Sequence, residues 1–367
     1  MIFWILYSSF VIALVLSKKF PDRSTKPLRD VDFLEVVAEL PNRPGNIDVD
    51  SKSGRIFFTF HPMGRQPNST LCNVCEWLPE NSSFVPFGDQ ALFTTVLSVR
   101  VFANSVFALD HMNLGQAGQP RMYQLDIADQ HVVHTFVFPD SVAPKMGNLN
   151  DFVISKDGKY AFITDLGILN NAPSLITLDF VSGKATKSLV NHESTRAKPR
   201  PSTLKIGNVG EVPVPFPLGV DSIALSKKGD FVFFSAVFDE FMWMVPTRSL
   251  IKGDAERFVD VAFPKPVSDG IVVDDATGVL YVTDFEHSAI WMTHPLQHGR
   301  HKTLIKEDKL LRWPDGLSIA SDEDGGRYLY ITCSAVHELF VDPPVFSPPY
   351  HILRIEVTGE GFIKDDL

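Results

Sequence analysis

Short apolar runs alternate with polar turns along almost the whole chain. In a clear copy, residues 150–165, the run Asn-Asp-Phe-Val-Ile-Ser is followed by the turn Lys-Asp-Gly-Lys and then by Tyr-Ala-Phe-Ile-Thr-Asp. An apolar run, a glycine or asparagine turn and a second β-branched or aromatic run are the signature of a β-hairpin. The other copies, two of them degenerate, begin near Gly45, Ser98, Asp221, Asp269 and Asp315.

The spacing of these hairpins predicts the fold. Successive copies begin about 50 residues apart, except for an interval of about 70 between the third and the fourth. A fixed period of this length built from strands is typical of propeller blades and not of a layered α/β sheet. We therefore predict an all-β fold, a six-bladed β-propeller that forms one domain over residues 31–367. The excess of the long interval, residues 191–217, is expected to be a loop over one face.

Two further strands are expected at the ends of this domain, at Val31–Leu40 and His351–Val357. Propellers close by placing strands from both chain ends in one blade, which removes the exposed sheet edge. The two segments are therefore predicted to share the last blade.

The N-terminus begins with a segment of a different kind. Residues 2–16 are an uncharged hydrophobic run, short for a membrane span and of the right length for a signal peptide. With Val15 and Ser17 at the positions that a signal peptidase inspects, residues 1–17 are predicted to be a signal peptide and 18–30 an exposed lead-in. An uncleaved signal anchor is the alternative. Both a signal peptide and a signal anchor predict a protein of the secretory pathway. After cleavage of a signal peptide, no membrane partner is expected.

Sequons and cysteines agree with an extracellular location. Asn68 and Asn81 are candidate glycosylation sites in a polar stretch between the first two blades. Cys72 and Cys75 have the spacing of a redox motif or of half a zinc site, but no second cysteine or histidine pair completes a zinc site. We predict a local disulfide between them and a buried free thiol at Cys333.

Charge and motifs exclude several classes of partner. The net charge is −10, and there is no long basic run, so nucleic acid is not an expected partner. The sequence also lacks a P-loop, a dinucleotide fingerprint and a nucleophile elbow, so no nucleotide cofactor is expected.

Several segments resemble the major royal jelly protein and yellow family. They are residues 98–101, 120–127, 138–139, 149–154, 161–167, 219–226, 245–250 and 313–318. The resemblance covers about residues 35–357 and implies a secreted six-bladed propeller. Some yellow-type members resemble dopachrome-converting tautomerases, whereas the royal jelly proteins are non-catalytic. The same segments are similar to gluconolactonase-type lactonases and to the strictosidine synthase group.

Propeller geometry predicts which side chains meet. The innermost strand of each blade leaves one face and the second strand returns to it, so the start of each copy and the residues after its second strand lie at the same face. The first set is Gly45, Ser98, Asn150, Asp221, Asp269 and Asp315. The second set is His61, His111, Asp165, Asp239, Asp284, His287 and His337.

The first set suggests a cation. It offers hard oxygen donors and no histidine, a composition that suits Ca²⁺ or another divalent cation and argues against zinc. The resemblance to the lactonases implies Asn150, Asp221 and Asp269 as ligands. Gly45 stands where those enzymes have a first-blade glutamate, and Asp315 is the candidate to replace it. The alternative is that these carboxylates only cap strand ends.

The second set supplies candidate catalysts, His61, His111, His287 and His337, because imidazole titrates near neutrality and can move a proton. A histidine at such a position is more often a surface or hydrogen-bonded structural residue, and this is the alternative for each. The sequence therefore predicts an enzyme of the tautomerase, isomerase or lactone hydrolase type, which acts on a small cyclic or aromatic metabolite at the channel mouth. The rival is a non-catalytic secreted protein that binds or stores a ligand.

Overall fold

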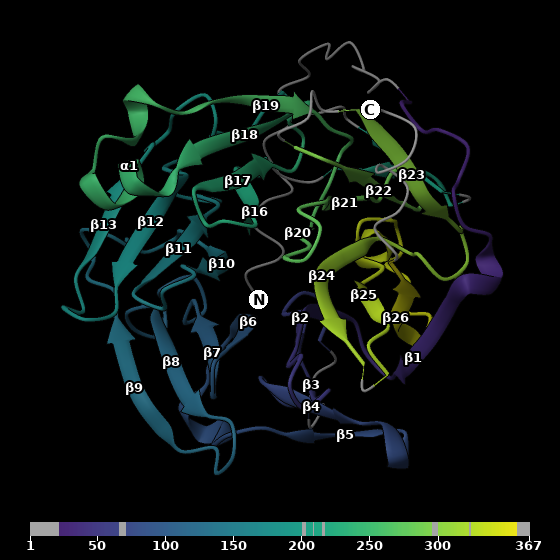
Figure 1. The fold of residues 1–367 in the computed structure, drawn as a ribbon, viewed down its shortest axis with the longest axis horizontal. Helices are drawn as coiled ribbons and strands as arrows, with labels where there is room; N and C mark the ends of the chain where they lie inside the picture. Colours follow the sequence, from purple (N-terminus) through teal and green to yellow (C-terminus); the bar gives the residue numbers. More distant parts are fainter. Residues whose placement is uncertain are drawn as a thin grey trace.

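A computed structural model describes residues 22–65, 71–199, 203–207, 209–214, 217–295, 300–322 and 324–357. In these residues the strands form six four-stranded antiparallel sheets and one separate hairpin. Figure 1 shows the six sheets arranged around a central axis, with β2, β6, β10, β16, β20 and β24 innermost. The predicted six-bladed propeller is confirmed.

Each blade follows the chain from the axis outward. Blade 1 contains β2 (Pro44–Val49), β3 (Ile56–Phe60), β4 (Cys75–Leu78) and β5 (Ser83–Pro86). Blade 2 contains β6 (Val96–Phe102), β7 (Ser105–Asp110), β8 (Arg121–Asp126) and β9 (Val132–Val137). Blade 3 contains β10 (Leu149–Ile154), β11 (Tyr160–Asp165), β12 (Ser174–Asp179) and β13 (Ala185–Ser188). Blade 4 contains β16 (Val220–Leu225), β17 (Phe231–Ala236), β18 (Phe241–Pro246) and β19 (Asp260–Pro264). Blade 5 contains β20 (Ile271–Val273), β21 (Leu280–Asp284), β22 (Ala289–Thr293) and β23 (His301–Lys306).

The last blade joins the two ends of the domain, as predicted. It contains β24 (Pro314–Ser321), β25 (Arg327–Cys333), β26 (Tyr350–Glu356) and β1 (Leu34–Leu40). Strand β26 lies between β25 and β1, with Leu34 opposite Ile355 and Leu40 opposite Tyr350. Strand β1 is shorter than expected, because Val31–Phe33 form a 3₁₀ turn. Before that turn, the lead-in follows β23: the amides of Leu28 and Arg29 donate to the carbonyls of Thr303 and Leu304.

The inner strands are largely buried on both faces because each sheet is packed between two others. All six residues of β7 and all six of β16 are buried. Such continuous runs are expected of strands without a solvent face. Apolar clusters fill the space between neighbouring sheets, for example Tyr281, Ile290, Leu329 and Leu353 between blades 5 and 6. The core is therefore a ring of sheet-to-sheet contacts around the channel.

Threonine hydroxyls at one position of the repeat join neighbouring blades. In each case a threonine near the end of the second strand donates to a carbonyl in the first strand of the next blade. These bonds run from Thr59 to Leu97, from Thr164 to Asp221 and from Thr332 to Gly45, at 2.9, 2.7 and 2.5 Å. They hold the beginnings of the inner strands, from which the channel side chains project.

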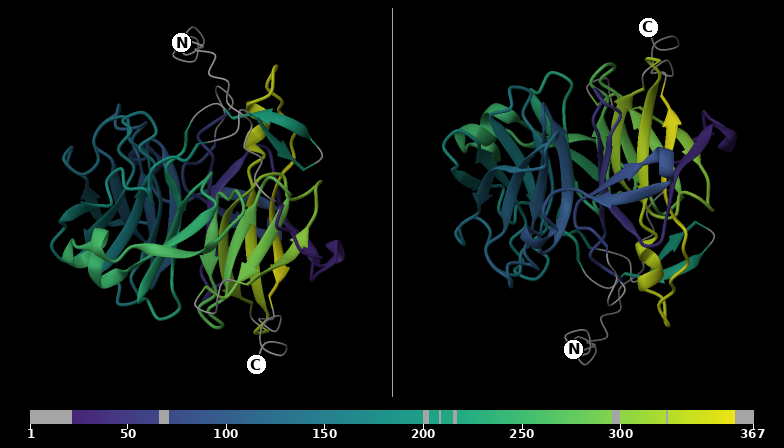
Figure 2. Two further views of the ribbon diagram at one scale, coloured as in Figure 1. Left: turned by 90° about the horizontal axis from the view of Figure 1, so that it is seen from above. Right: turned by 90° about the horizontal axis from the view of Figure 1, so that it is seen from below.

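The long interval before blade 4 folds over one face, and it is more ordered than a plain loop. It contains a hairpin, β14 (Thr203–Ile206) and β15 (Gly210–Pro213). Leu204, Ile206 and Val212 pack in one cluster with Phe285 and Trp313. Figure 2 shows this teal hairpin at one face, beside the C-terminal part of the chain. It therefore covers loops of blades 4, 5 and 6 at the end where the inner strands begin.

Several other predictions concern single residues. The structure joins Cys72 to Cys75 by a disulfide and places Cys333 as a buried free thiol in β25. Asn81 is exposed, whereas Asn68 and the predicted signal peptide lie outside the described residues. No helix in the described part of the chain is long and apolar enough to span a membrane.

Candidate functional site

Strand pairing brings the two predicted sets of residues to the same end of the channel. Leu149 at the start of β10 lies opposite Asp165 at the end of β11, and Val96 lies opposite Asp110 in blade 2. The starts of the inner strands and the loops after the second strands therefore share one face. That face carries the candidate site.

On the side of blades 3 to 6, four polar residues at or near the starts of inner strands form what we call the acidic half: Asn150, Asp221, Asp269 and Asp315. The Asn150 amide Nδ2 donates to Asp221 Oδ1 at 2.8 Å. The Trp313 indole Nε1 donates to Asp269 Oδ2 at 2.5 Å. Asp221 is 7% exposed, and the other three are partly exposed to the channel. The structure thus brings three predicted carboxylates together.

Crowding and burial change the acidity of these carboxyl groups. Burial, and then the charge of Asp269, hold the pKa of Asp221 well above its usual value. Burial raises the pKa of Asp269 to about 6, although the Trp313 donor and a hydrogen bond with Asp221 oppose the increase. Burial also raises the pKa of Asp315, with a further contribution from Asp269. Asp221 and Asp269 are linked by a hydrogen bond, and each carboxyl group therefore keeps its proton to a higher pH than an isolated aspartate does.

A second group, which we call the Arg100 cluster, lines the channel on the side of blades 1 to 3: Asn46, Ser98, Arg100 and Asp151. The Arg100 Nη2 donates to both carboxylate oxygens of Asp151, at 2.6 and 2.7 Å, and its Nη1 donates to Asn46 Oδ1. Ser98 Oγ also donates to Asp151, at 2.6 Å. Further along the channel, Asp48 accepts from Ser318 Oγ at 2.6 Å, and burial raises its pKa. Of this group, only Ser98 was predicted to line the channel.

One of these omissions, Arg100, had a signal in the sequence, whereas Asp151 did not. Arg100 is two residues after Ser98 on β6 and therefore projects from the same face of that strand. Asp151 follows Asn150, and alternation assigns it to the opposite face. A shift in register between Leu149 and Phe152 marks a β-bulge, which turns both polar side chains to the channel. Sequence alone does not reveal that bulge.

Two of the four candidate histidines are neutral and held by loop amides. His61 Nδ1 accepts from the amide of Met63 at 3.1 Å, and His111 Nδ1 accepts from the amide of Leu114 at 2.9 Å. Burial lowers the pKa of both imidazoles to about 4. Each ring therefore keeps its remaining proton on Nε2.

The other two histidines differ from these and from each other. His287 Nδ1 lies 2.9 Å from the carboxylate of Asp284, whose hydrogen bond raises the pKa of this imidazole. His337 is buried, and neither ring nitrogen has a hydrogen-bond partner within the described residues. Its ring is nearly parallel to Trp313 at 6.0 Å, and Trp313 stacks on Phe285 at 3.9 Å. Because Trp313 also donates to Asp269, His337 is the candidate histidine with an aromatic connection to the acidic half.

The aspartates of the second set support loops. Asp165 accepts from the amides of Asn148 and Gly167, and Asp239 accepts from the Trp243 indole at 2.8 Å. With Asp284 paired to His287, all three are engaged away from the channel axis.

Lys265 is a buried cation that the sequence analysis missed. It is 3% exposed, and its Nζ donates to the carbonyls of Val237 and Pro266 and to Ser268 Oγ, at 3.2, 3.0 and 3.0 Å. Burial lowers its pKa to about 7. A lysine between two prolines in an interblade loop gives no pattern from which burial can be predicted.

Comparison with known families identifies the chain. A family model described as "Major royal jelly protein" matches residues 109–346, more than half of the sequence. The chain belongs to the major royal jelly protein family. The resemblance carried by the sequence motifs is thereby confirmed. The comparison with curated proteins finds no match.

Solved structures similar to this family member share its propeller. A luciferin-regenerating enzyme has a TM-score of 0.58 at 12% identity, with 89% of this chain and 95% of that chain covered. A calcium-binding protein, regucalcin, from Agrobacterium tumefaciens has a TM-score of 0.56 at 15% identity, with 88% and 92% covered. A gluconolactonase from Xanthomonas campestris has a TM-score of 0.55 at 12% identity, with 88% and 89% covered. At these identities the likeness establishes the fold alone.

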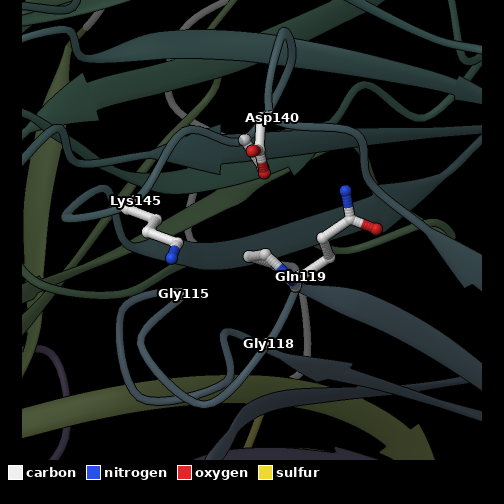
Figure 3. A pocket seen from close by; sticks show the side chains of 7 residues that line it. Gly115, Gly118, Gln119, Asp140 and Lys145 are labelled. Atoms are coloured by element: carbon white, nitrogen blue, oxygen red, sulfur yellow. The ribbon is translucent and has the colours of Figure 1, made fainter.

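The rim of this royal jelly family propeller contains two cavities. One of about 250 Å³ lies between the loop after β7 and the loop before β10, where Gln119, Asp140 and Lys145 surround its opening (Figure 3). The other, of about 180 Å³, lies between blades 3 and 4 and is lined in part by Asn171 and Arg196. Neither cavity is lined by a residue of the acidic half.

The donor atoms of the acidic half suit a hard cation, since they are carboxylate and amide oxygens. Burial is the main cause of the raised pKa values of Asp221, Asp269 and Asp315, and the charge of Asp269 adds to it for Asp221 and Asp315. In the described residues, however, the one group of three acidic or histidine side chains with ligand atoms already within 4.8 Å of one another is Asp126, Asp129 and His131, on an exposed turn. A cation in the acidic half therefore requires Asn150, water or rotation of the carboxylates to complete its coordination.

Proposed function

We propose that this protein is a secreted enzyme that acts on a small cyclic or aromatic metabolite at the channel mouth, by tautomerase-type proton transfer or by lactone hydrolysis. The observation that carries the proposal is the pair Asp221 and Asp269, two hydrogen-bonded carboxyl groups with raised pKa values beside a tryptophan. Titratable groups with such altered acidity gather at functional sites more often than elsewhere. Membership of a family that includes yellow-type proteins agrees with this assignment.

The carboxyl pair has the properties of an acid–base catalyst. With a pKa of about 6, Asp269 is largely ionised at neutral pH and accepts a proton from the substrate. Asp221, whose pKa is held well above its usual value by burial and by the charge of Asp269, is the group that delivers a proton to a second substrate atom. The proton on Asp269 then returns to Asp221 across their hydrogen bond, which restores the pair. The substrate is isomerised without net gain or loss of protons.

Trp313 and His337 give the site its aromatic side. Trp313 orients Asp269 through its indole donor, and the buried stack with Phe285 holds the indole in place. A buried imidazole with two unpartnered nitrogens is costly unless a ligand or water engages it. Of the four candidate histidines, we therefore assign the substrate-facing role to His337.

Asn150, Asp221, Asp269 and Asp315 are the residues that would hold a divalent cation. A cation bound there would polarise a substrate carbonyl as a Lewis acid. Two proteins of similar structure, a calcium-binding protein and a gluconolactonase, are compatible with this assignment.

A ligand-binding protein without catalysis is the second candidate. The cluster around β14 and β15 covers loops above the acidic half, and neither rim cavity reaches it. A site closed in this way suits retention of a ligand better than rapid turnover.

Activity assays with and without Ca²⁺ test the proposal. The purified protein is incubated with an aldonolactone and, separately, with dopachrome, in Ca²⁺ or in chelator. We expect turnover of one substrate class, with a rate that increases with pH through about 6 as Asp269 ionises. Binding of either compound without turnover, under all of these conditions, would replace the enzyme by the ligand-binding alternative.

Secretion gives a separate prediction. Expression in a eukaryotic secretory host should yield protein that begins near Lys18 and carries N-linked glycans on Asn68 and Asn81. Intact mass before and after glycosidase treatment measures this. Asn81→Gln should remove one glycan, since Asn81 is exposed. Secreted material with an intact Met1 would contradict cleavage.

A further inference from the structure

We propose that the guanidinium of Arg100 is a built-in cation, which takes the place of a metal ion on the side of blades 1 to 3 and confines exchangeable cations to the acidic half. The first part stands on the contacts of Arg100 alone. The second part rests on the cation site of the proposed function.

Oxygen atoms from three blades converge on Arg100 as they would on a metal. Asn46 of blade 1 supplies its Oδ1, and Asp151 of blade 3 supplies both carboxylate oxygens. The carbonyl of Val99 in blade 2 accepts from Nη1 at 2.8 Å. Nη2 contacts both oxygens of Asp151 while Nη1 is held by Asn46 and Val99, and these charge-assisted hydrogen bonds give the planar guanidinium a fixed orientation.

The two sides of the channel differ in how their charge is balanced. Asp151 is buried and has the guanidinium in direct contact. In the acidic half, the buried Lys265 acts on Asp221 and Asp269 through its charge alone, because its Nζ donates its three hydrogen bonds to Val237, Pro266 and Ser268. A cation is therefore in direct contact with a channel carboxylate in the Arg100 cluster, whereas Lys265 makes no hydrogen bond to the acidic half.

This arrangement also accounts for the first blade. Gly45 stands where the resemblance to lactonases leads one to expect a glutamate, and the adjacent Asn46 reaches the channel with a neutral amide. Arg100 already supplies the positive charge on this side of the channel. No metal ion has to bind there, and a carboxylate ligand from the first blade is not required. The amide oxygen of Asn46 is sufficient to accept from the guanidinium.

Calcium titration of Arg100→Gln tests the inference. Glutamine removes the charge and leaves Asn46, Ser98 and Asp151 free to coordinate an ion. We expect R100Q to bind one more equivalent of Ca²⁺ than the wild type in isothermal calorimetry. The double variant R100Q/D151N, which loses the principal ligand, should bind no additional equivalent.

Arg55→Gln is the matched control. Arg55 likewise contacts both oxygens of one carboxylate, because its Nε and Nη2 donate to Glu76 at 2.6 and 2.7 Å, but this ion pair joins Arg55 to β4, the third strand of blade 1. R55Q should bind as many equivalents as the wild type. An additional equivalent in R55Q as well would show an effect of any unpaired carboxylate and would overturn the assignment to the channel.

The outcomes separate this inference from the proposed function. If the wild type binds no Ca²⁺ and R100Q binds one equivalent, Arg100 is a built-in cation and the cation of the acidic half is wrong. No additional equivalent in R100Q overturns the inference, whatever the wild type binds. If R100Q does not fold in chelator, its refolding yield is the readout. Recovery with CaCl₂ but not with NaCl of equal ionic strength supports the inference, and no recovery contradicts it.

Discussion

Truncation after Pro349, which removes β26, is expected to unfold the protein. This strand pairs with β25 on one side and β1 on the other, so its loss opens the ring and detaches the N-terminal strand. Tyr350, Ile352, Leu353 and Ile355 are fully buried. Burial of each such side chain contributes about 1.5–3 kcal/mol and each ladder hydrogen bond about 1 kcal/mol. Together these losses exceed a typical stability of about 5–15 kcal/mol.

Thermal melting monitored by circular dichroism checks this expectation. The truncated chain should show no cooperative transition, whereas a chain that ends at Val357 retains all of β26 and should melt like the full-length protein.

The segment before β26 depends on the same closure. Arg43 is fully buried and donates to Glu338 and to the carbonyl of Val345, and its guanidinium lies 4.8 Å from the Tyr350 ring. A cooperative transition at the full-length temperature after truncation at Pro349 would rule out the shared blade.

The fold was predictable because its signal is local and repeated. Each hairpin, such as residues 150–165, contains its own turn and two apolar runs. The regular spacing of six such hairpins indicates a propeller. The join between β1 and β26 follows from the general need to leave no sheet edge. The hairpin β14–β15 was not predicted, because its short strands lie in a segment rich in proline and glycine.

The site was predictable only in part, since it depends on details of register and burial. Asp221, Asp269 and Asp315 follow from the repeat itself. Asp151 reaches the channel through a bulge, and Lys265 is buried by the loops of two blades. The histidines illustrate the same limit: their positions in the repeat are correct, but burial, which lowers the pKa of His61 and His111 to about 4, cannot be derived from sequence spacing.

Asp269→Asn is expected to have opposite effects in the absence and in the presence of Ca²⁺. In the folded protein, the pKa of Asp269 is raised from 3.8 to about 6, so the folded state retains a proton that the unfolded chain loses in this range. The free energy of unfolding of the cation-free protein therefore decreases as pH increases from about 4 to 6, and it decreases no further through this group above about 6. Asparagine does not ionise, so D269N does not undergo this loss of stability. The free energy of unfolding of D269N relative to the wild type should increase over that window by about 1–3 kcal/mol.

With Ca²⁺ present, the wild type should be more stable than D269N. Asp269 supplies one ligand oxygen and one negative charge, so its loss should weaken Ca²⁺ binding at least about tenfold, and any lactonase or tautomerase activity should decrease with it. Urea unfolding at pH 4, 5, 6 and 7, in chelator and in CaCl₂, measures both effects. Asp126→Asn is the control, because Asp126 belongs to the exposed group with Asp129 and His131. If Ca²⁺ stabilises the wild type and D269N equally but fails to stabilise D126N, the ion binds on the outer turn. The acidic half then contains the hydrogen-bonded carboxyl groups of Asp221 and Asp269 but no metal, and catalysis there rests on these two residues and on His337.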